Sequence, residues 1–174
     1  MKSLWIEEEP NLTNEIEELR EDQETEVCII GGGITGISIA YELTKRGKKV
    51  IILEKDKLAE KATGNTTAKI TSQHDLIYDY LVENYGIKYA KKYYNSNQEA
   101  IKNIEEIIKS ENIECDFEKQ DAYVFTQDAK KVEEIQKEIK AVKAIGGEAE
   151  FAKTIEANLE NIQRSNKISK SSQI

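Results

Sequence analysis

Apolar residues recur along this chain with two different periods, and the change from one to the other predicts the order of strands and helices. Two short apolar runs, Val27–Ile30 and Val50–Leu53, favour buried strands because they are too short for helices, and the second strand is predicted over residues 49–53. Between them lies a glycine turn, followed by apolar residues at helical spacing up to about Gly47. Residues 26–55 are therefore predicted to form a strand–helix–strand unit with parallel strands.

The remainder of the chain is predicted to be mainly helical after a polar loop over residues 56–71. The further predicted elements are helices near 76–85, 88–110 and 129–145, an extended piece at 114–117, and strands at 122–126 and 148–152. Asp128 is a favourable N-cap for the last helix, and Gly146 and Gly147 favour its end. After Lys153 polar residues dominate and the periodicity fades.

The apolar faces of two helices predict which of their side chains are packed. In the first helix the side expected to lie on the sheet consists of Ile34, Ile37, Ile39, Ala40 and Leu43. In the next helix the shared face consists of Leu76, Ile77, Tyr80 and Leu81. We therefore expect an N-terminal arm over residues 1–24, an α/β domain over 25–152 and a polar tail over 153–174.

Composition excludes several classes of protein. The formal net charge of −8 over 174 residues argues against a nucleic-acid partner, because phosphate recognition requires basic surface. The content of 39% hydrophobic and 33% charged residues is typical of a soluble protein, and no apolar run approaches the roughly 20 residues of a membrane span. The acidic start lacks the basic and apolar regions of a signal peptide, so we expect a cytoplasmic location.

The few cysteine and histidine residues offer no metal site. Cys28 lies in an apolar strand and is expected to be a small core residue, whereas Cys115 lies among charged residues as an incidental thiol. His74 is the single histidine, and no set of ligands with zinc-like spacing surrounds it. We expect no metal centre, and for His74 we favour a hydrogen bond at the entry to a helix over a role as catalytic base.

The glycine turn carries the strongest chemical signal. Gly31 permits a sharp turn after the strand, Gly33 lets the backbone approach a pyrophosphate, and Gly36 lets the helix pack closely on the strand. The helix N-terminus then faces the anion with unpaired N–H groups. Glu54 follows Gly31 by about 20 residues, which is the spacing of an acid that binds a ribose hydroxyl. Such an acid disfavours the 2′-phosphate of NADP, but the turn itself leaves NAD and FAD open.

Several consecutive motifs give the chain a family resemblance. The matching segments are residues 27–36 (VCIIGGGITG), 40–43 (AYEL), 50–55 (VIILEK) and 63–71 (TGNTTAKIT). Together they resemble the D-amino-acid-oxidase-like family of FAD-dependent oxidoreductases. The last motif, with Gln73 and His74 after it and Ser3, Leu4 and Trp5 near the start, resembles a bacterial subgroup that often carries a C-terminal Rieske domain. The resemblance extends over roughly residues 3–150.

The resemblance implies FAD as the cofactor and assigns candidate binding residues by position. Those implied for the ADP half are Gly31, Gly33, Ile34, Thr35, Gly36, Glu54 and Lys55. Those implied for the diphosphate or the isoalloxazine ring are Thr66, Thr67, Ala68 and Lys69. Lys69 is expected to stabilise negative charge on the reduced ring, with a solvent-facing loop lysine as the alternative. The resemblance assigns no catalytic residue.

The fold class expected from these observations is α/β: a partial Rossmann-like FAD-binding fold with a helical region and part of a substrate-domain sheet. The implied function is that of the N-terminal FAD-binding portion of an oxidoreductase that transfers hydride from a C–N bond of an amine or amino acid to FAD. A non-catalytic nucleotide-binding module is the alternative. An NAD enzyme is disfavoured because a long loop and helices follow the second strand.

The chain departs from the family pattern in one respect. The later parts of the family's fold and the Rieske ligands have no counterpart among these 174 residues, so we expect a truncated member. Apolar strands without their neighbours are an aggregation hazard. We therefore predict that this polypeptide alone is marginally stable and holds FAD poorly, and we consider a complementing chain as a partner.

Overall fold

The computed structural model describes residue 16, residues 18–152 and residues 165–173. The chain forms two compact units, Met1–Thr67 and Ala68–Ile174. Most of the predicted arm over residues 1–24 lies outside the described residues. Within those residues, none of the helices has the length and apolar character that crossing a bilayer requires.

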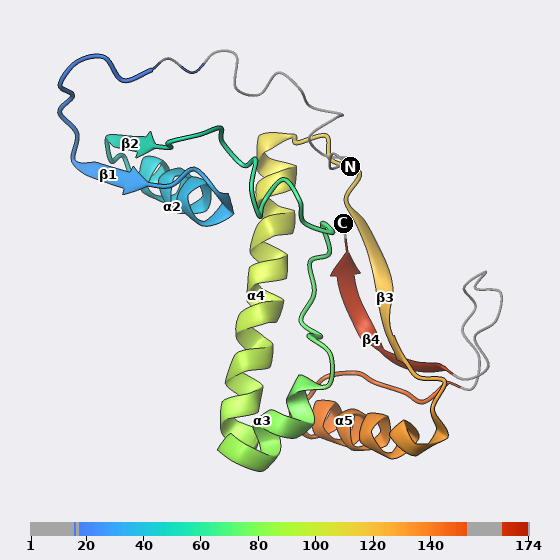
Figure 1. Ribbon diagram of the computed structural model, residues 1–174. Coiled ribbons are helices and arrows are strands. Elements are labelled where there is room, and N and C mark those ends of the chain that lie inside the picture. The colour runs from blue at the N-terminus through green and yellow to red at the C-terminus, as the bar shows by residue number, and fades with distance from the viewer. Residues whose placement is uncertain (1–15, 17, 153–164, 174) are drawn as a thin grey trace. The chain divides into compact units, whose positions relative to one another are not determined.

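The first unit is the strand–helix–strand unit that the apolar pattern predicted. β1 (Val27–Ile30) and β2 (Val50–Leu53) pair in parallel, and each residue of β1 lies opposite one of β2. α2 (Ile34–Lys45) connects the two strands and packs on one face of them (Figure 1). The Gly31 N–H donates to the Leu53 carbonyl at 2.8 Å, so the pairing continues into the glycine turn.

The apolar side chains of this unit are much less buried than the pattern predicted. In α2 the buried residue is Gly36, whereas Ile34 is 65% exposed and Ile39 is 46% exposed. At the end of β1, Ile30 is 89% exposed. The expectation that α2 buries a full apolar side is therefore wrong for the described chain, because a sheet of two strands is too narrow to cover it.

The second unit confirms the three helices predicted for it. α3 (Ile77–Tyr85) meets α4 (Ile87–Glu111) at Gly86, whose φ of +80° is accessible to glycine at little cost. α5 (Val132–Ala144) follows a short 3₁₀ turn and packs against α3 (Figure 1).

The ends of α5 follow the chemistry expected from the sequence. The Asp128 carboxylate accepts a hydrogen bond from the Lys130 N–H at 2.9 Å and so caps the 3₁₀ turn (Ala129–Lys131) with which the predicted helical segment begins, whereas α5 itself starts at Val132. At the other end Gly146 has a φ of +94°, and the Gly147 N–H donates to the Val142 carbonyl at 2.9 Å. The glycine pair thus ends the helix as predicted.

The hydrophobic core of the described chain lies in the second unit, between α3, α4 and α5. Its buried members include Tyr78, Leu81, Ala90, Ile135, Ile139 and Val142. The tyrosine predicted to pack from α3 was Tyr80, but Tyr80 is 52% exposed and Tyr78 is fully buried. The periodicity of a nine-residue helix did not decide between them.

The sheet of the second unit differs from the prediction. β3 (Glu118–Phe125) overlaps the strand predicted near 122–126 but starts four residues earlier, and it pairs antiparallel with β4 (Ser165–Gln173), as Figure 1 shows. The strand predicted at 148–152 is wrong, because those residues form no ladder. The strand that pairs with β3 is instead β4, a serine-rich segment. Its sequence lacks the apolar alternation that predicts a strand.

Candidate dinucleotide site

The glycine turn between β1 and α2 requires glycine at its first and last positions for different reasons. Gly31 has a φ of +107°, a backbone conformation that disfavours other residues. A Cβ at Gly36 would collide with the carbonyl oxygen of Gly31. The helix therefore starts directly against the end of the strand.

The middle of the turn is held by the segment that follows β2. Gly32 is buried, and a Cβ there would collide with the side chain of Leu58. The Ala59 N–H donates to the Gly32 carbonyl at 2.9 Å. The sequence indicated no role for Gly32, and its only signal was its place in the middle of three consecutive glycines.

The side chain of Glu54 also binds the glycine turn. Its carboxylate accepts from the Gly32 N–H at 2.8 Å and from the Asp56 N–H at 3.1 Å. The hydrogen bond from Gly32 and then that from Asp56 lower the pKa of Glu54 below its ordinary value. The acid stands at the end of β2 beside the turn, and Lys55 follows it on the exposed surface.

The N-terminus of α2 receives a cap from a residue that sequence analysis left unassigned. The Ile34 N–H donates to the hydroxyl oxygen of Thr63 at 3.0 Å, although 29 residues separate the two. Gly33, the N-cap position, provides no side-chain cap. A threonine in a polar loop is a weak signal by itself, so this contact was not predictable.

Two further N–H groups at this end have no described acceptor, that of the exposed Thr35 and that of the buried Gly36. The part of the chain that the structure describes includes no acceptor for the backbone N–H of Thr35 or Gly36. Thr35 is exposed, and a Cβ added to Gly33 would meet no atom closer than 3.4 Å. An anion can thus approach unpaired donors at the positive end of the helix dipole, which fits a diphosphate.

The other candidate residues form a loop that crosses the boundary between the units. Thr66 belongs to the first unit, and its N–H lies 3.4 Å from the Thr63 carbonyl. Thr67 ends that unit, while Ala68 and Lys69 begin the second. The structure therefore brings together the glycine turn, Glu54 and the start of the loop, and it describes Ala68 and Lys69 within the second unit alone.

His74 does not make the helix-entry hydrogen bond expected for it. The N-cap of α3 is Leu76, which provides no side-chain hydrogen bond. Instead, His74 Nδ1 lies 3.2 Å from the hydroxyl of Tyr93 on α4, and the two rings meet edge to face. His74 is an exposed ring held by a tyrosine.

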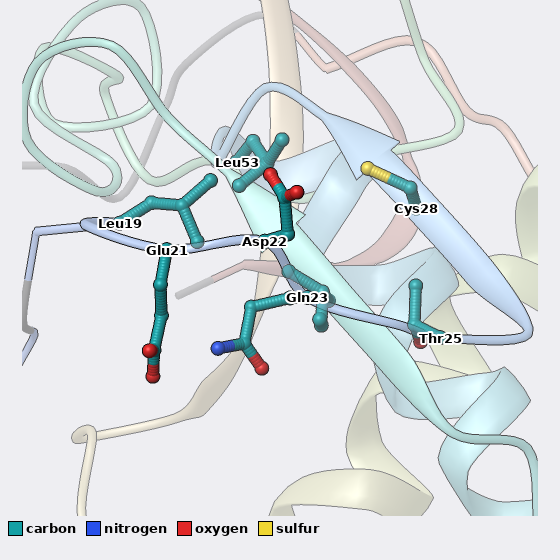
Figure 2. A pocket seen from close by; sticks show the side chains of 8 residues that line it. Leu19, Glu21, Asp22, Gln23, Thr25, Cys28 and Leu53 are labelled. Atoms are coloured by element: carbon teal, nitrogen blue, oxygen red, sulfur yellow. The ribbon is translucent and has the colours of Figure 1, made fainter.

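A pocket of about 260 Å³ lies on the sheet face opposite α2 (Figure 2). Its lining includes Leu19, Asp22, Gln23, Thr25, Cys28 and Leu53. Cys28 was expected in the core but is exposed, because Ile29 faces α2 and the alternation of the strand turns Cys28 to the other side. None of the predicted cofactor-binding residues lines this pocket.

No group of three potential ligands among the described histidines, cysteines and acids is arranged to hold a metal ion.

Comparison with known proteins assigns the family. Residues 26–167 match the family described as DAO, FAD dependent oxidoreductase. The chain is 44% identical over 137 residues to the putative Rieske 2Fe-2S iron-sulfur protein YhfW of Bacillus subtilis, covering 79% of this chain and 27% of that protein. It is 34% identical over 101 residues to the probable oxidoreductase OrdL of Haemophilus influenzae, covering 58% and 23% of the two.

A third relative adds a named substrate. The chain is 30% identical over 99 residues to the gamma-glutamylputrescine oxidoreductase of Escherichia coli, covering 57% of this chain and 23% of that protein. The chain thus spans about a quarter of the length of the curated relatives it matches. The match over most of the chain and the βαβ geometry agree, and the chain belongs to the DAO family of FAD-dependent oxidoreductases.

Proposed function

We propose that this chain is the N-terminal FAD-binding portion of an oxidoreductase that acts on a small amine or amino acid. The observation that carries the proposal is the start of α2, where the glycine turn leaves the Thr35 and Gly36 N–H groups without described acceptors. The family's cofactor is FAD, and a diphosphate is the part of FAD that such a helix end binds. The proposed domain over residues 25–152 contains this site.

The proposed contacts to the ADP half follow from the geometry of the turn. Gly33 lets the diphosphate approach, the N–H of the exposed Thr35 donates to its oxygens, and the buried Gly36 holds the helix start against the strand. Glu54 already accepts two backbone hydrogen bonds. A carboxylate has about four acceptor positions, so ribose hydroxyls can donate to the remaining ones. A 2′-phosphate there would meet negative charge, which argues against NADP.

The proposed contacts to the rest of the cofactor involve Thr66, Thr67, Ala68 and Lys69. Threonine hydroxyls and backbone N–H groups of this loop are suitable donors for phosphate oxygens. The Lys69 ammonium supplies a positive charge that stabilises an electron-rich ring. When bound, FAD supplies hydride-accepting chemistry, and in this proposal the hydride comes from a C–N bond. The gamma-glutamylputrescine oxidoreductase relative supports an amine substrate.

We further infer that turnover requires more of the family's fold than these residues supply. The relatives are about four times as long as the matched segment, and in the described chain each strand of the first unit has one neighbour. Either further sequence or a complementing chain is proposed to complete the substrate site. A cytoplasmic location stays a prediction. If no completing part exists, the alternative is a nucleotide-binding module without turnover.

The site is tested by titrating the purified chain with ADP, FAD and NADP⁺ and following backbone amides by NMR. We expect ADP and FAD to shift the amides of Gly33, Thr35 and Gly36, with weak affinity, and NADP⁺ to shift them less. Gly33→Val should abolish the ADP shifts because its side chain fills the approach to the helix end. Shifts confined to other residues would overturn the proposed site.

Turnover is tested separately by amine oxidase assays. The chain alone is expected to be inactive with gamma-glutamylated and simple amines. Activity is expected only when the remaining family fold is supplied, either fused or as a second chain. Activity of the chain alone would contradict the need for a completing part, whereas inactivity of a flavin-loaded, completed protein would favour the non-catalytic alternative.

A further inference from the structure

The second unit contains a buried polar network directly after the proposed cofactor loop. Among the described residues the buried polar side chains are Ser72, Gln73 and Glu138, with exposed fractions of 1%, 5% and 0%. All three belong to one set of hydrogen bonds. Buried polar groups are costly unless they are paired, so a network of this kind imposes a specific arrangement on the segments that it joins.

Glu138 lies at the centre of this network. Its Oε1 accepts from Gln73 Nε2 at 2.6 Å and from the Tyr78 N–H at 3.0 Å, and its Oε2 accepts from the Asp79 N–H at 2.7 Å. A side chain of α5 therefore satisfies the first N–H groups of α3 and also holds the loop residue Gln73. All three partners are donors, so the carboxylate oxygens act only as acceptors in this network.

Ser72 is held from two further helices. Its carbonyl accepts from the hydroxyl of Tyr78 on α3, and its own hydroxyl accepts from Gln98 Nε2 on α4 at 2.7 Å. The Gln73 N–H donates to the Thr71 hydroxyl at 3.0 Å. Each of the three helices thus contributes a side chain that binds this segment.

The same arrangement fixes the next residue along the chain. The Tyr93 hydroxyl that binds His74 belongs to a ring that packs edge to face on Tyr78, with centroids 6.1 Å apart. His74 is therefore held at the surface by a tyrosine that packs on the fully buried Tyr78. Lys69 lies five residues before it, at the other end of the short segment that the network anchors.

A simple helix cap would not require this construction. Serine, threonine, aspartate or asparagine at the N-cap position satisfies the first N–H groups of a helix locally. Here that position is Leu76, and the cap comes from Glu138, about 60 residues later in the chain. Burial raises the pKa of Glu138, and the three donors act against that rise. A buried acidic side chain is a costlier cap than a local serine or aspartate, which favours a role beyond capping.

We propose that Glu138 is a positioning residue which, through Gln73, fixes the segment of residues 70–75 and so determines where Lys69 and His74 are presented. The inference rests on the proposed function, because Lys69 faces the cofactor only if that proposal holds. The fixing of residues 70–75 by Glu138 does not depend on a bound cofactor. It can therefore be tested on the free protein.

The test is amide hydrogen exchange on the full chain and three variants. Gln73→Ala removes the contact to the segment and leaves Glu138 bonded to α3, so exchange of the residue 73 amide, which donates to the Thr71 hydroxyl, should rise about tenfold or more while the Tyr78 and Asp79 amides stay protected. Glu138→Gln weakens both contacts, so exchange should rise in both places. Glu134→Gln on the exposed side of α5 is the matched control and should change neither.

Exchange rates of amides in the middle of α4 serve as the reference for global stability. If Gln73→Ala leaves exchange of the residue 73 amide unchanged, or if Glu138→Gln affects only the start of α3, Glu138 is a cap alone and the inference is overturned. FAD titration of the unmodified chain decides the proposed function independently. Failure of FAD to bind would leave the exchange result for the segment intact.

Discussion

The hydroxyl oxygen of Thr63 lies 3.0 Å from the backbone nitrogen of Ile34 and caps the N-terminus of α2. A residue of the loop that follows β2 thus reaches the helix end at which an anion is expected to bind. The cap satisfies one N–H of the first turn and leaves those of Thr35 and Gly36 without acceptors in the described chain. The loop and the glycine turn therefore form one local structure.

Thr63→Val should destabilise the first unit by about 1 kcal/mol, because it removes a helix cap while keeping the branched shape. The change is measured as faster amide exchange in α2 and β1. Thr44→Val, at an exposed position near the other end of α2, is the matched control and should have little effect. Equal effects of the two variants would show that the cap contributes nothing specific.

Gly36→Ala should lower the stability of the first unit, whereas Gly33→Ala should weaken ADP binding. A Cβ at Gly36 collides with the Gly31 carbonyl, and such overpacking typically costs about 1–3 kcal/mol. A Cβ at Gly33 has room in the free chain, so Gly33→Ala should fold and instead weaken ADP binding. Circular dichroism melting and ADP titration separate the two. A fully stable Gly36→Ala variant would contradict the close approach.

Glu54 should make the stability of the first unit depend on acid pH. The N–H groups of Gly32 and Asp56 lower its pKa, so its contribution is present above the ordinary glutamate pKa of 4.5 and is lost as the pH falls through the lower folded value. Exchange of the Gly32 amide, measured from pH 6 downward, should therefore accelerate beyond the intrinsic trend in acid. Glu54→Gln should remove this dependence.

Glu42→Gln is the control for that experiment. Glu42 lies on α2 with its carboxylate 3.6 Å from Arg46, and both side chains are exposed, so the pair contributes little. Removing the Glu42 charge should not change how the exchange rate of the Gly32 amide depends on acid pH. If Glu42→Gln and Glu54→Gln behave alike, the dependence arises from general charge and not from the turn.

Glu105 should titrate at unusually low pH. Its carboxylate lies 2.6 Å from both Lys109 and Lys119, and these hydrogen bonds lower its pKa to about 2. Lys119→Met should raise that pKa toward the ordinary value, and Lys102→Met, which removes a different exposed pair, should not. NMR titration of the side-chain carboxyl carbons gives both values. A normal pKa in the unmodified chain would refute the bridge from α4 to β3.

The two units should differ in local stability. The fully buried apolar residues of the described chain lie in the second unit, whereas Ile30 and Ile34 of the first unit are largely exposed. Amides of β1 and β2 should therefore exchange faster than those in the middle of α4 and α5. This experiment also tests the predicted marginal stability of the chain. Slower exchange in the strands would contradict it.

Local patterns determined much of this structure. The short apolar runs, Asp128 and the paired glycines at 146 and 147 predicted elements and ends that the structure confirms. These features depend on residues close in sequence, whose backbone preferences are nearly independent of the rest of the chain. The glycine spacing likewise indicated the ligand class, and the family assignment agrees with it.

Contacts between distant residues required the tertiary structure. The cap of Thr63 on Ile34, the buried Glu138 beside Gln73 and the pairing of β4 with β3 each join residues at least 29 positions apart. Periodicity does not record such contacts, because it reports which face of an element is apolar and not what meets that face. The exposed Cys28 has the same cause: its strand is apolar on both faces, and in the described chain one face carries a helix.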